Sequence, residues 1–129
     1  MEMVQLNEEL KKLGNEVIEE TPDFEHLKKL KIGYLVSDKK KKNGRKTVFG
    51  ECEKVSDKWR ELTGYDFLIT FYADAAEEVI SKEARKHLMT HELKHIGYDP
   101  VDESRYIVPH DVEDFQECLD LWGINWIAK

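Results

Sequence analysis

The chain has 129 residues, of which 40% are hydrophobic and 36% are charged, and its formal net charge is −7 at pH 7. No apolar run is long enough to span a membrane, and the first residues lack the basic-then-apolar order of a secretion signal, so we expect a soluble, cytoplasmic protein with no membrane partner. The acidic balance also argues against nucleic acid as the main partner.

The N-terminal part of the chain is predicted to be helical. Apolar residues recur at helical spacing over residues 4–20, which indicates an amphipathic surface helix. Pro22 should end this helix, because proline disfavours the helical conformation of the residue before it, here Thr21. A second, shorter helical piece is expected over residues 24–30.

A β-hairpin is predicted next. Residues 32–36 and 47–50 are rich in β-branched and aromatic side chains, and between them lies Asn43-Gly44, the dipeptide typical of a two-residue hairpin turn. The lysines of residues 39–46 would then lie on the two arms near the tip. Such a lysine-rich edge usually discourages aggregation, and a weak contact with nucleic acid is the alternative interpretation.

A helix and a buried strand follow. Residues 53–62 have a helical stripe of apolar side chains that ends at Gly64. Residues 65–72 are apolar for most of their length, so we expect this strand to lie inside the sheet or along the wall of a cleft. It could also bind an extended peptide by strand addition.

The next helix carries the motif with the clearest chemistry. We predict it over residues 82–96, with Ser81 as its N-cap and Gly97 as its C-terminal stop. It contains His91-Glu92-Leu93-Lys94-His95, an H-E-x-x-H sequence. Residues four apart lie on one face of a helix, so both imidazoles can bind one metal ion, and Glu92 can take a proton from the bound water.

A catalytic zinc takes three protein ligands and leaves the fourth position to water. The metzincin pattern is excluded, because Tyr98 and Val101 stand where it requires glycine and histidine. His110 is the preferred third ligand, since it ends a predicted loop over residues 98–109 that can return to the helix. The alternative ligands are the nearby carboxylates of Asp99, Asp102, Glu103, Asp111, Glu113 and Asp114.

The remaining histidines and the cysteines are expected to be structural or exposed. His87 lies one turn before His91, but three successive turns of a straight helix cannot all reach one tetrahedral ion. Cys52 and Cys118 form no CxxC pair, and small buried thiols are the expected interpretation for both.

A last helix is predicted over residues 112–121. The chain therefore predicts an α+β fold in a single domain, residues 1–129, with a small mixed or antiparallel sheet, an H-E-x-x-H helix and flanking helices. Within it we distinguish an N-terminal helical segment, residues 1–30, and a core, residues 31–129.

The order of these motifs resembles the putative phage metallopeptidase family. Members of this family are small zincin-like proteins of phages and prophages, and they are related in style to SprT-like proteases. The resemblance covers most of residues 30–123. It is carried by Ile32-Gly33-Tyr34-Leu35-Val36, Val48-Phe49-Gly50-Glu51-Cys52, Tyr65-Asp66-Phe67-Leu68-Ile69, the H-E-x-x-H motif and His110-Asp111-Val112-Glu113-Asp114-Phe115. It implies that His91, His95 and His110 bind Zn²⁺, that Glu92 is the catalytic base, and that the protein acts in the cytoplasm of a bacterial host.

The predicted function is a zinc-dependent metallopeptidase that cleaves a peptide or protein substrate by means of a zinc-bound water activated by Glu92. Candidates for stabilising the tetrahedral oxyanion are Tyr98, Arg105 and Tyr106. One alternative is a metal-stabilised, non-catalytic binding module of phage or prophage origin. Another is a protease that acts near DNA and uses the hairpin of residues 39–46 as its anchor.

Overall fold

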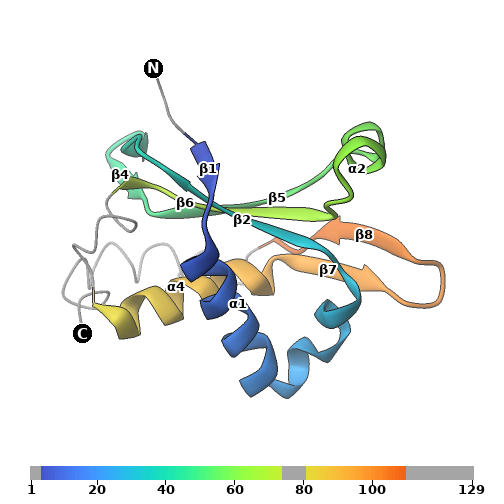
Figure 1. Ribbon diagram of the computed structural model, residues 1–129. Helices are drawn as coiled ribbons and strands as arrows, with labels where there is room; N and C mark the ends of the chain where they lie inside the picture. Colours follow the sequence, from blue (N-terminus) through green and yellow to red (C-terminus); the bar gives the residue numbers. More distant parts are fainter. Residues whose placement is uncertain (1–3, 74–80, 110–129) are drawn as a thin grey trace.

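A four-stranded sheet forms the centre of the computed structural model, which describes residues 4–73 and 81–109 (Figure 1). Its strand order is β1-β2-β6-β5. The strands are β1 (Val4–Leu6), β2 (Ile32–Ser37), β6 (Phe67–Phe71) and β5 (Gly50–Lys54). β2 and β6 run parallel, whereas β1 and β5 are antiparallel to their neighbours. The predicted mixed α+β architecture with a small mixed sheet is confirmed for the described residues.

The helices α1 (Glu8–Glu20), η1 (Pro22–Lys29) and α4 (Lys82–Lys94) lie on one side of this sheet (Figure 1). Side chains of β6 and α4, among them Phe67, Ile69, Met89 and Leu93, have 0% exposure. Each such side chain stabilises the fold by about 1.5–3 kcal/mol relative to an exposed one. These side chains belong to one hydrophobic core cluster, which packs the motif helix against the sheet.

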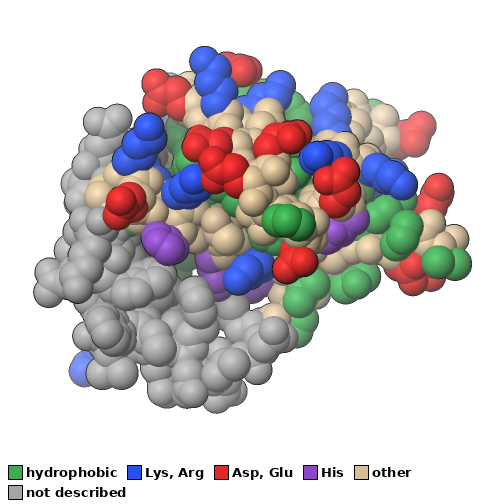
Figure 2. Space-filling view, turned by 90° about the horizontal axis from the view of Figure 1, so that it is seen from below, with side chains coloured by type: hydrophobic (Ala, Val, Ile, Leu, Met, Phe, Trp, Pro, Cys, Tyr) green, Lys and Arg blue, Asp and Glu red, His purple; other side chains and the backbone are tan. Residues whose placement is uncertain are grey.

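Acidic and basic side chains are interspersed on the helical face, which Figure 2 shows from below. Lys28, for example, lies 3.0 Å from Glu25 and 3.6 Å from Glu19. Within residues 4–73 and 81–109, the visible part of this face carries no continuous basic surface of the kind that binds nucleic acid.

The start of the chain differs from the prediction. Residues 4–6 form β1 rather than the first turn of a helix, and α1 begins only after Asn7, whose side chain accepts a hydrogen bond from Leu10 N at 3.0 Å. Val4 and Leu6 are two positions apart, a spacing that suits a strand as well as a helix. The backbone N–H of Asn7 also donates to Tyr34 O, which continues the pairing with β2.

The lysine-rich hairpin is confirmed, but its arms are not those predicted. β3 (Lys41–Asn43) and β4 (Lys46–Val48) pair with each other in a sheet of their own. The predicted turn at Asn43-Gly44 is wrong by one residue, because Asn43 pairs with Lys46 and the turn consists of Gly44, at a φ of 66°, and Arg45. β2 is not part of this hairpin, because it lies between β1 and β6.

The helix predicted over residues 53–62 is shorter than expected. β5 occupies its start, and α2 (Asp57–Thr63) begins after Ser56 and ends at Gly64, which has a φ of 81° as a C-cap glycine should. Of the apolar side chains on the predicted stripe, Val55 is buried but precedes the helix, whereas Trp59 and Leu62 are 57% and 69% exposed.

The predicted central strand is confirmed as β6, which pairs with β2 on one side and β5 on the other. Both of its edges are thus hydrogen-bonded within the sheet. Strand addition of a peptide to β6 is therefore wrong, and the outer strand β5 is the edge on that side of the described sheet.

The segment after α4 is a hairpin rather than a loop. β7 (Ile96–Asp99) pairs with β8 (Ser104–Ile107), so the predicted helix ends two residues early, with His95 as its C-cap. Gly97 does not stop the helix but lies in β7, where a Cβ would stand 2.1 Å from the ring of Tyr106. Glycine is required here because two chain segments approach closely.

No helix in residues 4–73 and 81–109 is both long and apolar enough to cross a bilayer. The predictions for His110, Asp111, Glu113, Asp114, Cys118 and the helix over residues 112–121 lie outside the described residues. The single-domain organisation stays a prediction.

Candidate metal centre

The end of α4 brings together three side chains that can bind a metal ion. His91, Glu92 and His95 each offer one ligand atom, and these atoms lie within 4.8 Å of one another. The helix starts at a capped position, where Ser81 Oγ accepts from Ala84 N at 3.0 Å. The two histidines are half-buried and Glu92 is 3% exposed.

The spacing of the two imidazoles fits a zinc ion. His91 Nε2 and His95 Nε2 are 3.2 Å apart, and the ring planes are nearly perpendicular at 87°. Two nitrogens bound to one zinc at about 2.0–2.1 Å, with a near-tetrahedral angle, would be separated by about 3.2–3.4 Å. In the metal-free chain the same distance is that of a hydrogen bond from His91 Nε2–H to His95 Nε2, so the separation fits both this bond and a shared ion.

A backbone carbonyl orients the second histidine. His95 Nδ1 lies 2.7 Å from Val108 O, and since a carbonyl only accepts, Nδ1–H must be the donor. This leaves the lone pair of Nε2 directed toward His91. The backbone N–H of Val108 donates in return to His95 O at 2.7 Å. A metal-binding histidine usually gives its other N–H to such an acceptor.

Glu92 lies against β5. A Cβ at Gly50 would stand 3.1 Å from Glu92 Oε2 and 3.2 Å from Thr70 O, so the absence of a side chain at Gly50 makes room for the carboxylate. Burial, followed by the negative charge of Glu51, raises the pKa of Glu92 from its ordinary value of 4.5 to about 8. A group with a pKa near neutrality can both accept and return a proton.

The thiol of Cys52 is part of the same surroundings. Burial, with smaller contributions from the charges of Glu92 and Glu53, raises its pKa to about 12. It packs against the hydrophobic core, as the sequence predicted for a small buried thiol, and is not among the residues grouped as metal ligands.

A polar cluster next to Gly50 was missed from the sequence. Tyr72 Oη donates to Glu51 Oε2 at 2.8 Å, and Lys41 Nζ forms an ion pair with the other oxygen of Glu51. Lys41 also lies 5.3 Å from the centre of the Tyr72 ring. One lysine of the basic hairpin is thus paired beside the candidate site. Residues 50–53 alternate between small or apolar and acidic side chains, which could have indicated a strand, but the predicted strand ends at residue 50 and the predicted helix begins at residue 53.

The predicted oxyanion stabilisers have different surroundings. Arg105 is 7% exposed and its guanidinium donates to Val55 O, Asp66 O and Asp57 Oδ1, so its assignment to the oxyanion is wrong. Tyr98 is half-buried in β7, and Tyr106 is 49% exposed on β8.

Two carboxylates of the β7–β8 hairpin stabilise its turn. Asp99 and Asp102 accept backbone hydrogen bonds from Val101 and Ser104, both at 2.9 Å. Neither these nor Glu103 joins the His91, Glu92 and His95 group within residues 4–73 and 81–109. His87 is exposed, as expected. The other candidate third ligands, His110, Asp111, Glu113 and Asp114, lie outside the described residues.

The raised pKa of Glu92 predicts a pH-dependent stability for the metal-free protein. The folded chain holds this proton more tightly than the unfolded chain, so the stabilisation is complete below about pH 4.5 and is lost as the pH rises to about 8. We expect the free energy of unfolding, measured with urea in the presence of a chelator, to fall by a few kcal/mol over this interval. Glu92→Gln is the control, and an equal fall in both proteins would contradict the assignment.

Comparison with known proteins gives one match. A family model described as putative phage metallopeptidase matches residues 2–128, nearly the whole chain. No curated protein and no solved structure matches. The family resemblance seen in the sequence is thereby confirmed.

Proposed function

The chain belongs to the putative phage metallopeptidase family, and from this premise we propose that it is a zinc-dependent, zincin-like peptidase. One observation carries the proposal of a metal site: His91 Nε2 and His95 Nε2 lie 3.2 Å apart, with His95 held in the tautomer that a metal ligand needs. Zinc is the proposed ion because it suits an H-E-x-x-H helix. His110 is the proposed third ligand, because neutral imidazole suits zinc and the family resemblance includes this residue.

The proposed reaction is hydrolysis of a peptide bond by water. When bound, zinc lowers the pKa of a coordinated water and polarises the scissile carbonyl. Glu92 accepts the proton of the attacking water and later gives it to the leaving amine. Its buried position beside Gly50 supports this double role, because its carboxylate lies within 4.8 Å of the two imidazole ligand atoms. Tyr98 and Tyr106 remain the candidates for stabilising the oxyanion.

We propose that an extended peptide pairs with β5 rather than with β6. β5 is the outer strand of the described sheet on this side, and Gly50 at its start lies next to the Glu92 carboxylate. Pairing of a substrate backbone with this edge would carry its carbonyl groups past the catalytic base.

Metal removal and reloading test the proposal. The purified protein, stripped by a chelator and refilled with zinc, is expected to bind one zinc ion per chain and to cleave a mixture of unfolded proteins, with cleavage sites read by mass spectrometry. Cleavage should disappear in the stripped protein and return with zinc. A protein that binds zinc, unfolds on its removal and cleaves nothing would instead be the non-catalytic binding module.

A further inference from the structure

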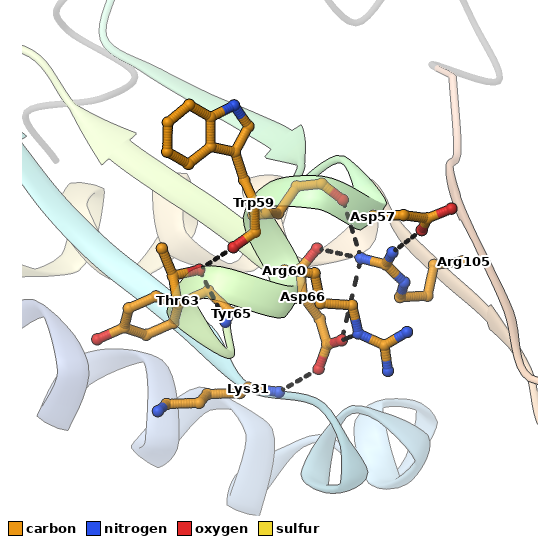
Figure 3. A network of polar contacts seen from close by, with 9 residues as sticks. Lys31, Asp57, Trp59, Arg60, Thr63, Tyr65, Asp66 and Arg105 are labelled. Carbon is orange, nitrogen blue, oxygen red and sulfur yellow. Dashed lines mark hydrogen bonds and ion pairs between the residues drawn. The ribbon is translucent and has the colours of Figure 1, made fainter.

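A buried arginine connects the β7–β8 hairpin to the sheet. The side chain of Arg105, on β8, is only 3% exposed. Its Nη1 donates to Val55 O at 3.1 Å and to Asp66 O at 2.9 Å, and its Nη2 donates to Asp57 Oδ1 at 2.9 Å (Figure 3). A buried guanidinium is tolerated only when its donors are satisfied in this way.

The acceptors of Arg105 belong to the framework of the fold. Val55 directly follows β5, Asp57 begins α2, and Asp66 directly precedes β6. Asp66 is itself held in place, because its Oδ2 accepts from Lys31 N at 2.8 Å and its Oδ1 lies 2.7 Å from Arg60 Nε (Figure 3). The Arg105 side chain therefore joins β8 to the end of β5 and to the start of β6 in the central sheet.

The same hairpin carries the acceptor that orients His95. Arg105 precedes Val108 by three positions in the chain, and β7 begins immediately after His95. A two-stranded hairpin is marginally stable by itself, so its position relative to α4 needs an anchor. Glu92 lies against Gly50 at the start of β5, and Arg105 binds Val55, the residue after the end of β5. Arg105 therefore also fixes the position of the hairpin relative to the strand that lies beside Glu92.

We infer that Arg105 is a positioning residue for the metal centre. By fastening β8 to the sheet, it keeps Val108 O within hydrogen-bond distance of His95 Nδ1, and so keeps the His95 ring in the tautomer and orientation that place its Nε2 next to His91 Nε2. The metal-binding part of this inference depends on the proposed function. The part that concerns the His95 ring does not.

Arg105→Lys tests the inference, because it keeps the positive charge and removes the planar guanidinium that donates to three acceptors at once. We expect zinc affinity, measured by competition with a chelator, to fall by about 10–100-fold. In the metal-free protein, long-range ¹H–¹⁵N spectra should show His95 changing from one Nδ1–H tautomer to a mixture. Arg60→Lys is the matched control, since Arg60 pairs with the same Asp66 but is not bonded to β8. It should change neither the zinc affinity nor the His95 tautomer.

Asp57→Asn provides a second variant in case Arg105→Lys does not fold. The Asp57 side chain is 95% exposed, so its replacement removes one partner of Arg105 without opening the core. A several-fold loss of zinc affinity, together with the tautomer change, is expected. A folded Arg105→Lys or Asp57→Asn protein with the wild-type His95 spectrum would overturn the inference. If the wild-type chain binds no zinc, the proposed function fails, and the tautomer reading alone still decides the role of Arg105.

Discussion

Glu92→Gln is expected to lower kcat/KM by about 10²–10⁴-fold, the usual contribution of a general acid–base residue. The amide is nearly isosteric with the carboxylate and fits the space beside Gly50, but it cannot accept the proton of the attacking water. Since His91 and His95 are unchanged, zinc content should stay at the wild-type level. The rate is measured on a fluorogenic peptide chosen from the cleavage sites, and the metal by elemental analysis.

Glu53→Gln is the matched control for this experiment. Glu53 is an exposed residue of β5, and its replacement removes one negative charge near Cys52 without touching the proposed base. Activity within a few-fold of wild type is expected for it. If Glu92→Gln kept more than a tenth of the wild-type rate, Glu92 would not be the base.

His91→Ala and His95→Ala should each weaken zinc binding by roughly 10²–10³-fold. Zinc sites with four protein ligands bind with about 10–16 kcal/mol, which corresponds to about 2.5–4 kcal/mol for each ligand. Zinc affinity is measured by chelator competition, and peptide cleavage at a fixed zinc concentration should fall with it. His110→Ala belongs to the same series, and as the proposed third ligand it should show a loss of the same size.

His87→Ala separates loss of a ligand from loss of a histidine. His87 is exposed one turn before His91 on α4 and is expected to leave zinc affinity unchanged. A wild-type zinc affinity in His91→Ala or His95→Ala would show that the replaced histidine is not a ligand. A large loss of affinity in His87→Ala would place the ion closer to the N-terminus of α4.

Local signals predicted the parts of the fold that local chemistry determines. The Ser81 cap, the C-cap at Gly64 and the apolar run that became β6 were all readable from the sequence. The pairing of His91 with His95 followed from helical periodicity, and the structure places their Nε2 atoms 3.2 Å apart.

The errors come from patterns with two physical meanings. Val4 and Leu6 satisfy strand spacing as well as helical spacing, and only pairing with β2 decides between them. Gly97 suggested a helix stop, but the reason for glycine is the ring of Tyr106 on the neighbouring strand. Arg105 was a candidate for stabilising the oxyanion. Its structural role could not be predicted, because its hydrogen-bond acceptors, Val55 O and Asp66 O, are far away in the chain.

The parallel pairing of β2 with β6 has a consequence for the order of folding. Ile32 pairs with Phe67, so the central sheet closes only after 35 intervening steps of chain (67 − 32) have been brought together. His91, His95 and Val108 instead lie within one short stretch that needs only local contacts. Local contacts form faster than distant ones, so the sheet, and not the histidine pair, sets the folding rate. When the full-length chain refolds in the presence of a metal ion, we therefore expect His91 and His95 to come together before the sheet beneath them is complete.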